Sequence, residues 1–185
     1  MKLIESGIPD VLVFEPKVFE DNRGYFMESY RQEWLLGKGV DVEFKQDNLS
    51  RSGRGVLRGL HYQVTNAQAK LVMVTHGEVL DVAVDIRKGS PTFGKYVKQL
   101  LSAENRRIMF IPEGFAHGFY VLSDYADFLY KCSRYYDPSG ERGLHYADPQ
   151  LNIDWGAKQP ILSEKDQVLP SLENINPEDL PVYSK

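Results

Sequence analysis

The chain has 185 residues, of which 42% are hydrophobic, a size and composition typical of one globular domain with a sizeable core. A formal net charge of −4 offers no positive field to a nucleic-acid polymer, so any phosphate binding must be local. The single Cys132 cannot form an intrachain disulfide, Glu5 and Pro9 interrupt the apolar N-terminus, and no apolar run reaches membrane-spanning length. We therefore expect a single domain over residues 1–185 that is cytoplasmic and binds neither nucleic acid nor membrane.

Short β-prone segments separated by turn residues fill the chain as far as residue 134. Asp21-Asn22-Arg23-Gly24 is typical of a turn, and residues 31–38, which end at Gly37 and Gly39, indicate a short helix. Residues 78–86 alternate Val79, Asp81, Ala83 and Asp85 with aliphatic residues, as a strand does. We expect strands at residues 11–14, 25–30, 42–49, 56–63, 70–75, 78–86, 96–101, 107–111, 117–122 and 127–134.

The last fifty residues differ in texture. Six prolines interrupt them, and Ser163-Glu164-Lys165-Asp166 is typical of a helix N-terminus. Many short, closely spaced strands followed by such a tail predict an all-β fold, an antiparallel sandwich or barrel with few short helices. The extended C-terminal tail should wrap the sheet.

Two spaced motifs make the fold prediction more specific. Gly55 precedes His61 by five intervening residues, and Lys70 precedes Gly77 by six, which matches the outline of the first cupin motif. Pro112-Glu113-Gly114-Phe115-Ala116-His117 matches the second. Together they predict a cupin-type jelly roll, a double-stranded β-helix closed around a pocket.

The same motifs argue against a metal. Metal-binding cupins take two His and a Glu from the first motif and a third His from the second. Here Gln63 stands at the second His position and Lys70 at the spacing of the Glu, leaving only His61 and His117 as good ligands. Because an ammonium would repel a cation, we expect no metal and no other cofactor, and an organic acid/base site in the pocket.

Six motifs in order resemble the dTDP-4-dehydrorhamnose 3,5-epimerase family, and the resemblance runs from about residue 14 to residue 169. They are Arg23-Gly24-Tyr25-Phe26-Met27-Glu28, Gln46-Asp47-Asn48, Arg58-Gly59-Leu60-His61-Tyr62-Gln63, Pro112-Glu113-Gly114-Phe115-Ala116-His117-Gly118-Phe119, Leu129-Tyr130-Lys131-Cys132 and Leu162-Ser163-Glu164-Lys165-Asp166. The resemblance implies epimerisation at C3 and C5 of dTDP-4-dehydro-6-deoxy-D-glucose to dTDP-4-dehydro-L-rhamnose, in dTDP-L-rhamnose biosynthesis. Both carbons lie next to a ketone, so the reaction needs a base, an acid and a cation near the enolate oxygen.

The resemblance also implies the catalytic roles. His61 matches the family's base, and Asp166 the carboxylate that orients it. Tyr130 matches the acid on the opposite face of the sugar. Lys70 would stabilise the enolate oxygen, with His117 hydrogen-bonding nearby.

Further positions match residues that hold the nucleotide sugar. Arg23, Arg58 and Lys165 suit diphosphate oxygens, and Tyr136 matches an aromatic residue that stacks on thymine. The remaining matches to substrate contacts are Glu28, Gln46, Asp47, Asn48 and Glu141. In this family an N-terminal strand segment reaches into a partner subunit, so a homodimer with exchanged strands is implied, in which Arg23 and Glu28 serve the neighbour's pocket.

Structural roles remain open for several of these residues. A lone His on an apolar strand is usually a satisfied core residue, which applies to His61 and more strongly to His117. Arg58 could be a solvated edge charge and Arg23 a turn residue. Tyr136, beside Tyr135, could serve packing. Separately, Asp81 and Asp85 could be paired carboxylates, although a solvated or hydrogen-bonded strand face is the better interpretation.

Three other functions compete with the double epimerase. A C3-only or C5-only epimerase, or a keto-isomerase of a related dTDP-keto sugar, would use the same base. A non-catalytic sugar-nucleotide-binding cupin would keep Arg58 and Lys165 but lose the base or the acid, and here His61 and Tyr130 are both present. A metal-dependent cupin oxygenase would contain stoichiometric iron or manganese.

Overall fold

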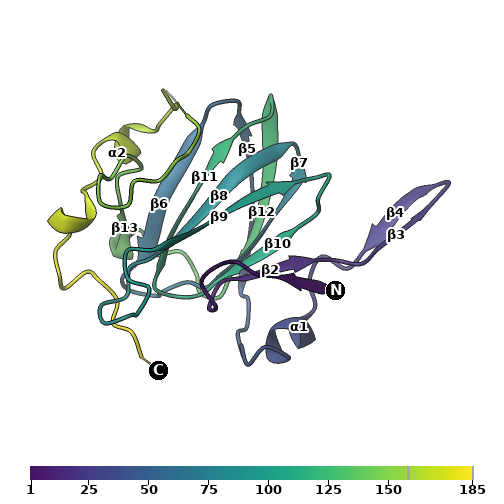
Figure 1. Cartoon of the computed structure of the whole chain (residues 1–185), viewed down its shortest axis with the longest axis horizontal. Helices are drawn as coiled ribbons and strands as arrows, with labels where there is room; N and C mark the ends of the chain where they lie inside the picture. The colour runs from purple at the N-terminus through teal and green to yellow at the C-terminus, as the bar shows by residue number, and fades with distance from the viewer. Residues whose placement is uncertain (158, 185) are drawn as a thin grey trace.

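Two antiparallel sheets face each other in the computed structural model, which describes residues 1–157 and 159–184 (Figure 1). The six-stranded sheet has the order β1 (Lys2–Ile4), β2 (Leu12–Glu15), β10 (Ile108–Ile111), β7 (Lys70–His76), β12 (Tyr125–Cys132) and β5 (Gln46–Gly53). The five-stranded sheet has the order β13 (Glu141–Gly143), β6 (Leu57–Gln63), β11 (Phe115–Val121), β8 (Glu78–Asp85) and β9 (Tyr96–Ser102). The predicted all-β sandwich with few short helices is confirmed.

The inner faces of the two sheets enclose the main core. Val72 and Phe128 from the first sheet belong to one buried cluster with Val79 and Phe119 from the second. The rings of Phe119 and Phe128 stack with centroids 4.2 Å apart, so the two sheets are in direct contact there. Alternating strand residues supply this inner layer, as the period of two requires.

Segments without strands cover the outer faces. The C-terminal segment places Trp155 and Leu172 against Leu57 and Val82 of the five-stranded sheet. It includes the short elements η1 (Pro138–Gly140), α2 (Glu164–Gln167) and η2 (Leu172–Asn174). The helix α1 (Gln32–Leu36) packs its Leu35 onto the other sheet. As predicted, the tail wraps the sheet, which brings α2 to the edge of the pocket.

A close crossing of β6 and β11 fixes the geometry of the site. A Cβ atom at Gly59 would lie 2.6 Å from the carbonyl oxygen of His117, so only glycine allows the two backbones this approach. The register shifts at this crossing and then pairs His117 directly with His61. The two histidines of the two cupin motifs thereby come to lie side by side.

A two-stranded hairpin of β3 (Val18–Asp21) and β4 (Gly24–Met27) projects from the sandwich (Figure 1). Its aromatic residues Phe19, Tyr25 and Phe26 are more than half exposed. Asn22 and Arg23 form its turn, as predicted.

Several predicted boundaries are wrong. The strand predicted over residues 42–49 begins only at Gln46, because Val42 and Phe44 pack with α1 on the outer face. The strand predicted over residues 25–30 ends at Met27. The short strands β1, β3 and β13 carry no alternation long enough to be recognised. None of the helices in the described residues is long and apolar enough to cross a membrane.

Candidate active site

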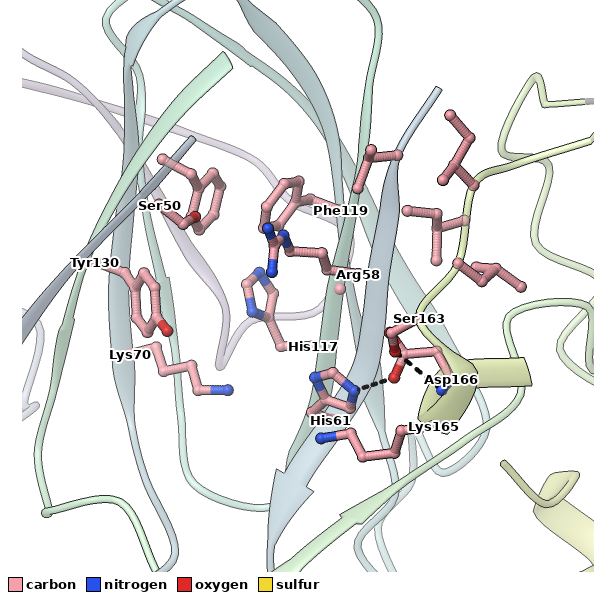
Figure 2. A pocket seen from close by; sticks show the side chains of 16 residues that line it. Ser50, Arg58, His61, Lys70, His117, Phe119, Tyr130, Ser163, Lys165 and Asp166 are labelled. Atoms are coloured by element: carbon pink, nitrogen blue, oxygen red, sulfur yellow. Dashed lines mark hydrogen bonds and ion pairs between the residues drawn. The ribbon is translucent and has the colours of Figure 1, made fainter. Parts of the chain in front are cut away.

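A cavity of about 580 Å³ opens between the sheets, and all four predicted catalytic residues line it (Figure 2). Strand β6 contributes His61 and Arg58, β11 contributes His117, and the C-terminal segment contributes Lys165 and Asp166. The opposite wall carries Lys70 from β7 and Tyr130 from β12. Residues 105 positions apart thus meet at one site because the tail folds back along β6.

His61 and Asp166 form a short, oriented pair. The Nε2 atom of His61 lies 2.6 Å from Oδ1 of Asp166, whose side chain is only 4% exposed. A carboxylate accepts hydrogen bonds, so Nε2 carries the hydrogen and Nδ1 is left with the lone pair. The site therefore contains a histidine with the tautomer and orientation of a general base.

The helix α2 fixes the carboxylate of this pair. Ser163, the N-cap of α2, accepts a 3.1 Å hydrogen bond from the backbone N–H of Asp166. Burial would raise the pKa of Asp166, but hydrogen bonds from His61, Ser163 and the backbone of Gly59 hold that pKa below its ordinary value. Asp166 is therefore ionised at neutral pH and can stabilise a protonated His61.

Tyr130 and Lys70 face His61 across the cavity (Figure 2). Burial raises the pKa of Tyr130, so the phenol keeps its proton well above neutral pH. Burial lowers the pKa of Lys70, and among the described residues no carboxylate forms an ion pair with its ammonium. A protonated phenol and a lysine side chain thus lie opposite His61.

A second histidine–carboxylate pair joins His117, which lines the cavity, to Asp81 of β8. The Nε2 atom of His117 is 3.0 Å from both carboxylate oxygens of Asp81, which is fully buried. Of the better interpretation, a solvated or hydrogen-bonded strand face, the hydrogen-bonded form is confirmed, because Asp81 and Asp85 are both buried and each has its own hydrogen-bond partner. The alternative, that the two carboxylates are paired with each other, is wrong. Asp85 binds Arg87, while Asp81 orients His117.

The sequence interpretation missed Asp81 and Ser163 as parts of the site. A signal for Asp81 exists: it shares a strand face with Val79 and Ala83, both of which belong to the inner core, so it had to point between the sheets. The Ser-x-x-Asp spacing of a helix N-terminus similarly placed Ser163 next to Asp166. Phe119 and Phe128 form the apolar part of the cavity lining. Apart from their β-propensity, the sequence contains no pattern that would have placed them at the site.

A smaller cavity of about 310 Å³ shares His61, Lys70 and Tyr130 with the first. It is lined by predicted substrate-binding residues, namely Gln46, Asn48, Tyr136 and Glu141. Glu141 accepts hydrogen bonds of 2.8 Å from both Tyr136 Oη and Lys165 Nζ. Burial opposes the ionised form of Glu141, but these two donors hold its pKa below the ordinary value.

Arg58 is oriented toward the larger cavity by a 2.9 Å hydrogen bond from its Nε to Ser52 Oγ. Three predicted residues are not brought to either cavity. Asp47 forms an ion pair with Lys131, Arg23 with Asp21 in the hairpin turn, and Glu28 with Arg31.

The positions that hold the metal in other cupins are engaged in other bonds here. His61 and His117 each direct Nε2 at a carboxylate, and the amide of Gln63 is bonded to the backbone of Asp137. Lys70 adds a positive charge at the fourth position. This set of donors suits an anion or a developing negative charge better than a divalent cation.

The molecule is a cupin-type jelly roll whose pocket holds a carboxylate-bound histidine, a phenol and a lysine side chain, a set of groups that can support acid/base chemistry. The family model described as dTDP-4-dehydrorhamnose 3,5-epimerase matches residues 5–174, and the chain belongs to this family.

Named relatives agree with this membership. A dTDP-4-dehydrorhamnose 3,5-epimerase of Pseudomonas aeruginosa is 59% identical over 169 residues, which is 90% of this chain and 93% of the relative. The crystal structure of the dTDP-6-deoxy-D-glucose-3,5-epimerase from Legionella pneumophila, in complex with dTDP-4-keto-L-rhamnose, is 52% identical with a TM-score of 0.97 and covers 100% of this chain and 99% of that one. A 3'-monoepimerase from Streptomyces bikiniensis, in complex with dTDP-quinovose, is 35% identical with a TM-score of 0.88 and covers 94% of this chain and 90% of that one.

Proposed function

We propose that this protein is an isomerase that inverts C3 and C5 of dTDP-4-dehydro-6-deoxy-D-glucose, giving dTDP-4-dehydro-L-rhamnose for dTDP-L-rhamnose biosynthesis. The observation that carries the proposal is the placement of His61, held by Asp166, across one cavity from Tyr130, with the ammonium of Lys70 beside the phenol. The family membership and the curated relatives, which bear the name of this activity, support it.

The reaction proceeds by proton transfer through an enolate. Nδ1 of His61 takes the hydrogen from the carbon next to the ketone, and the electron pair of the C–H bond passes into the C4 oxygen as an enolate. Lys70 stabilises the negative charge that develops on this oxygen, with His117 as a further hydrogen-bonding group. Tyr130 then donates its phenolic proton to the opposite face of the same carbon.

The same groups act on the second carbon after both have exchanged protons with solvent. His61 releases its proton, Tyr130 regains one, and the sugar ends with two inverted centres and no change in oxidation state. Because the ketone alone acidifies both hydrogens, the residues of this chain suffice for the chemistry.

The nucleotide lies toward the smaller cavity in this proposal. Tyr136 offers a half-exposed ring to thymine, while Arg58 and Lys165 supply cations for the diphosphate. Gln46, Asn48 and Glu141, which line the smaller cavity, complete the contacts in this proposal, whereas Asp47 lies in neither cavity and stays a prediction. The complex of the Legionella pneumophila relative with dTDP-4-keto-L-rhamnose supports this class of ligand.

We also propose a homodimer that exchanges the β3–β4 hairpin. The hairpin exposes Phe19 and Phe26, and Arg23 in its turn lines neither of the two cavities of the candidate site. Arg23, together with Glu28 just beyond β4, would then complete the pocket of a second copy. Sedimentation of the purified protein as a dimer, and loss of affinity for dTDP in Arg23→Ala, would support the exchange.

We further propose that residues 1–185 form one domain and that the protein is cytoplasmic. Contacts of the C-terminal segment with the core of the five-stranded sheet support the first, and the buried free thiol of Cys132 is compatible with a reducing compartment.

The deciding experiment follows deuterium by NMR while the protein acts on dTDP-4-keto-6-deoxyglucose in heavy water. Incorporation at both C3 and C5 is the expected result. Incorporation at one carbon would select a monoepimerase, the activity named for the 35% identical Streptomyces bikiniensis protein. No incorporation at either carbon would refute the proposed function.

A further inference from the structure

Three glutamine side chains hold the backbone of residues 134–137, here called the Tyr136 segment. This segment lies between β12 and η1, outside the strands. Gln68 Nε2 donates to the carbonyl of Arg134 at 2.9 Å, and Gln46 Oε1 accepts from the backbone N–H of Tyr136 at 3.1 Å. Gln63 both donates to the carbonyl of Asp137 and accepts from its N–H, each at 3.1 Å.

Gln63 makes the most complete of these attachments. Its carboxamide pairs with one residue in the manner of a strand partner, using both polar ends. It stands in register with Glu141 of β13, so it joins the middle of the connection that carries Tyr136 to the strand that follows it. Thr65 adds a 2.8 Å hydrogen bond to the carboxylate of Asp137. The position that supplies the second histidine in a metal-binding cupin here fixes a loop.

Gln46 is similarly engaged within the protein. Its Nε2 donates to Asn48 Oδ1 at 2.9 Å while its Oε1 accepts from Tyr136. Because both ends of this amide already have partners, its contribution to substrate binding is to hold Tyr136 rather than to present a free polar group.

The attachments set the position of the Tyr136 ring. With its backbone held from β5 and β6, Tyr136 donates from Oη to Glu141, which also accepts from Lys165. The ring remains 49% exposed at the smaller cavity, so packing alone does not hold it. Hydrogen bonds with the three glutamine amides take the place of the packing contacts that hold a buried aromatic residue.

We propose that Gln63, assisted by Gln46 and Gln68, is a positioning residue that presents Tyr136 to the nucleotide of the substrate. The inference rests on the proposed function, because it assumes that Tyr136 stacks on the base. A segment ordered before the ligand arrives pays no ordering entropy on binding, so the glutamines act on nucleotide affinity and not on proton transfer. Gln63 touches neither the reacting carbons nor the catalytic His61–Asp166 pair in this assignment.

The test is a double-mutant cycle between Gln63 and Tyr136, read as the Kd of dTDP by titration calorimetry. Gln63→Met keeps the length of the side chain and removes both hydrogen bonds to Asp137. Tyr136→Ala should raise the Kd of dTDP roughly 10- to 100-fold, the usual effect of losing a base–aromatic stack. Gln63→Met alone should raise the Kd of dTDP about 5- to 20-fold. In the Tyr136→Ala background the same change should raise this Kd less than about twofold.

A steady-state measurement separates positioning from a merely structural role. Gln63→Met should raise KM for the keto sugar nucleotide and leave kcat within about twofold, whereas a loss of folded protein would lower apparent kcat at unchanged KM. Gln150→Met, the same change at an exposed turn residue that lines neither cavity, is the matched control and should alter neither. Gln68→Met removes only the hydrogen bond to the carbonyl of Arg134 and should give a smaller rise in KM, which provides a reading if the Gln63→Met variant does not fold.

Two results would overturn the inference while leaving the proposed function intact: wild-type Kd and KM in Gln63→Met, or fully additive effects in the cycle. Unchanged Kd in Tyr136→Ala would refute the assignment of the nucleotide to this segment and the inference with it. Failure of the wild-type protein to exchange deuterium at C3 and C5 would refute the proposed function itself.

Discussion

Replacing Asp166 by asparagine should cost about three orders of magnitude in kcat. The carboxylate lies 2.6 Å from His61 Nε2 and is almost fully buried, so water screens the pair poorly. For two unit charges about 4 Å apart at an effective dielectric constant of about 20, the attraction is about 4 kcal/mol. The neutral amide would lose this stabilisation of the imidazolium form of His61, and at about 1.36 kcal/mol per tenfold in rate the loss is about 10³-fold.

The assay is the rate of deuterium uptake at C3 and C5 of the keto sugar nucleotide, measured with saturating substrate. The Kd of dTDP should stay within about threefold, because the asparagine keeps the shape of the side chain. Glu164→Gln, the same chemical change on the exposed neighbour in α2, is the matched control and should keep wild-type rates. A rate for Asp166→Asn within about threefold of the wild type would refute the role given to the pair.

The same geometry leads to three further predictions. In Tyr130→Phe, His61 should still remove the proton from C3 or C5, but the proton should return to the same face. The variant should therefore keep deuterium exchange at these carbons while losing net inversion. An equal loss of exchange and inversion would contradict Tyr130 as the acid. Burial lowers the pKa of Lys70 from 10.5 and raises that of Tyr130 from 10.0, so the alkaline limb of kcat should lie below pH 10.5 and report Lys70. Lys70→Arg should move that limb upward, and an unmoved limb would assign it to another group. Asp85→Asn should lower the free energy of unfolding at pH 7 by about 3 kcal/mol in urea denaturation, since it leaves the guanidinium of Arg87 without its buried partner. Burial opposes ionisation of Asp85, but hydrogen bonds from Arg87, Ser90 and Thr92 lower its pKa below 3.8. The stabilisation by ionised Asp85 is therefore present above about pH 4 and is lost in stronger acid. The difference in free energy of unfolding between the wild type and Asp85→Asn should accordingly become smaller below about pH 4.

Most of the sandwich could be predicted because its strands alternate over seven or eight residues. The strand predicted at 78–86 appears as β8, and the helix expected at 31–38 appears as α1. Strands of three or four residues, such as β1 and β13, contain too few alternations to separate them from loops. The apolar run at Val42 and Phe44 was misassigned because burial against a helix and burial in a sheet select the same residue types.

The candidate site was predictable in residue identity but not in connectivity. The spacing of the two cupin motifs placed His61 and His117 near each other, and they are register partners. The His61–Asp166 pair depended on the resemblance to a family, since no local pattern links residues so distant in sequence. The pairing of Asp81 with His117, and the attachment of residues 134–137 by three glutamines, arise from tertiary packing that spacing does not encode.

The variant His61→Ala removes the proposed catalytic base itself. The variant should show no deuterium uptake at C3 or C5 in heavy water. In the proposed mechanism Asp166 binds Nε2 of His61 and leaves Nδ1 free to take the proton, and the alanine has no such nitrogen. Its Kd for dTDP should remain close to that of the wild type, since the nucleotide contacts lie elsewhere. Uptake at an undiminished rate, or loss of dTDP binding together with uptake, would contradict the assignment of His61 as the catalytic base.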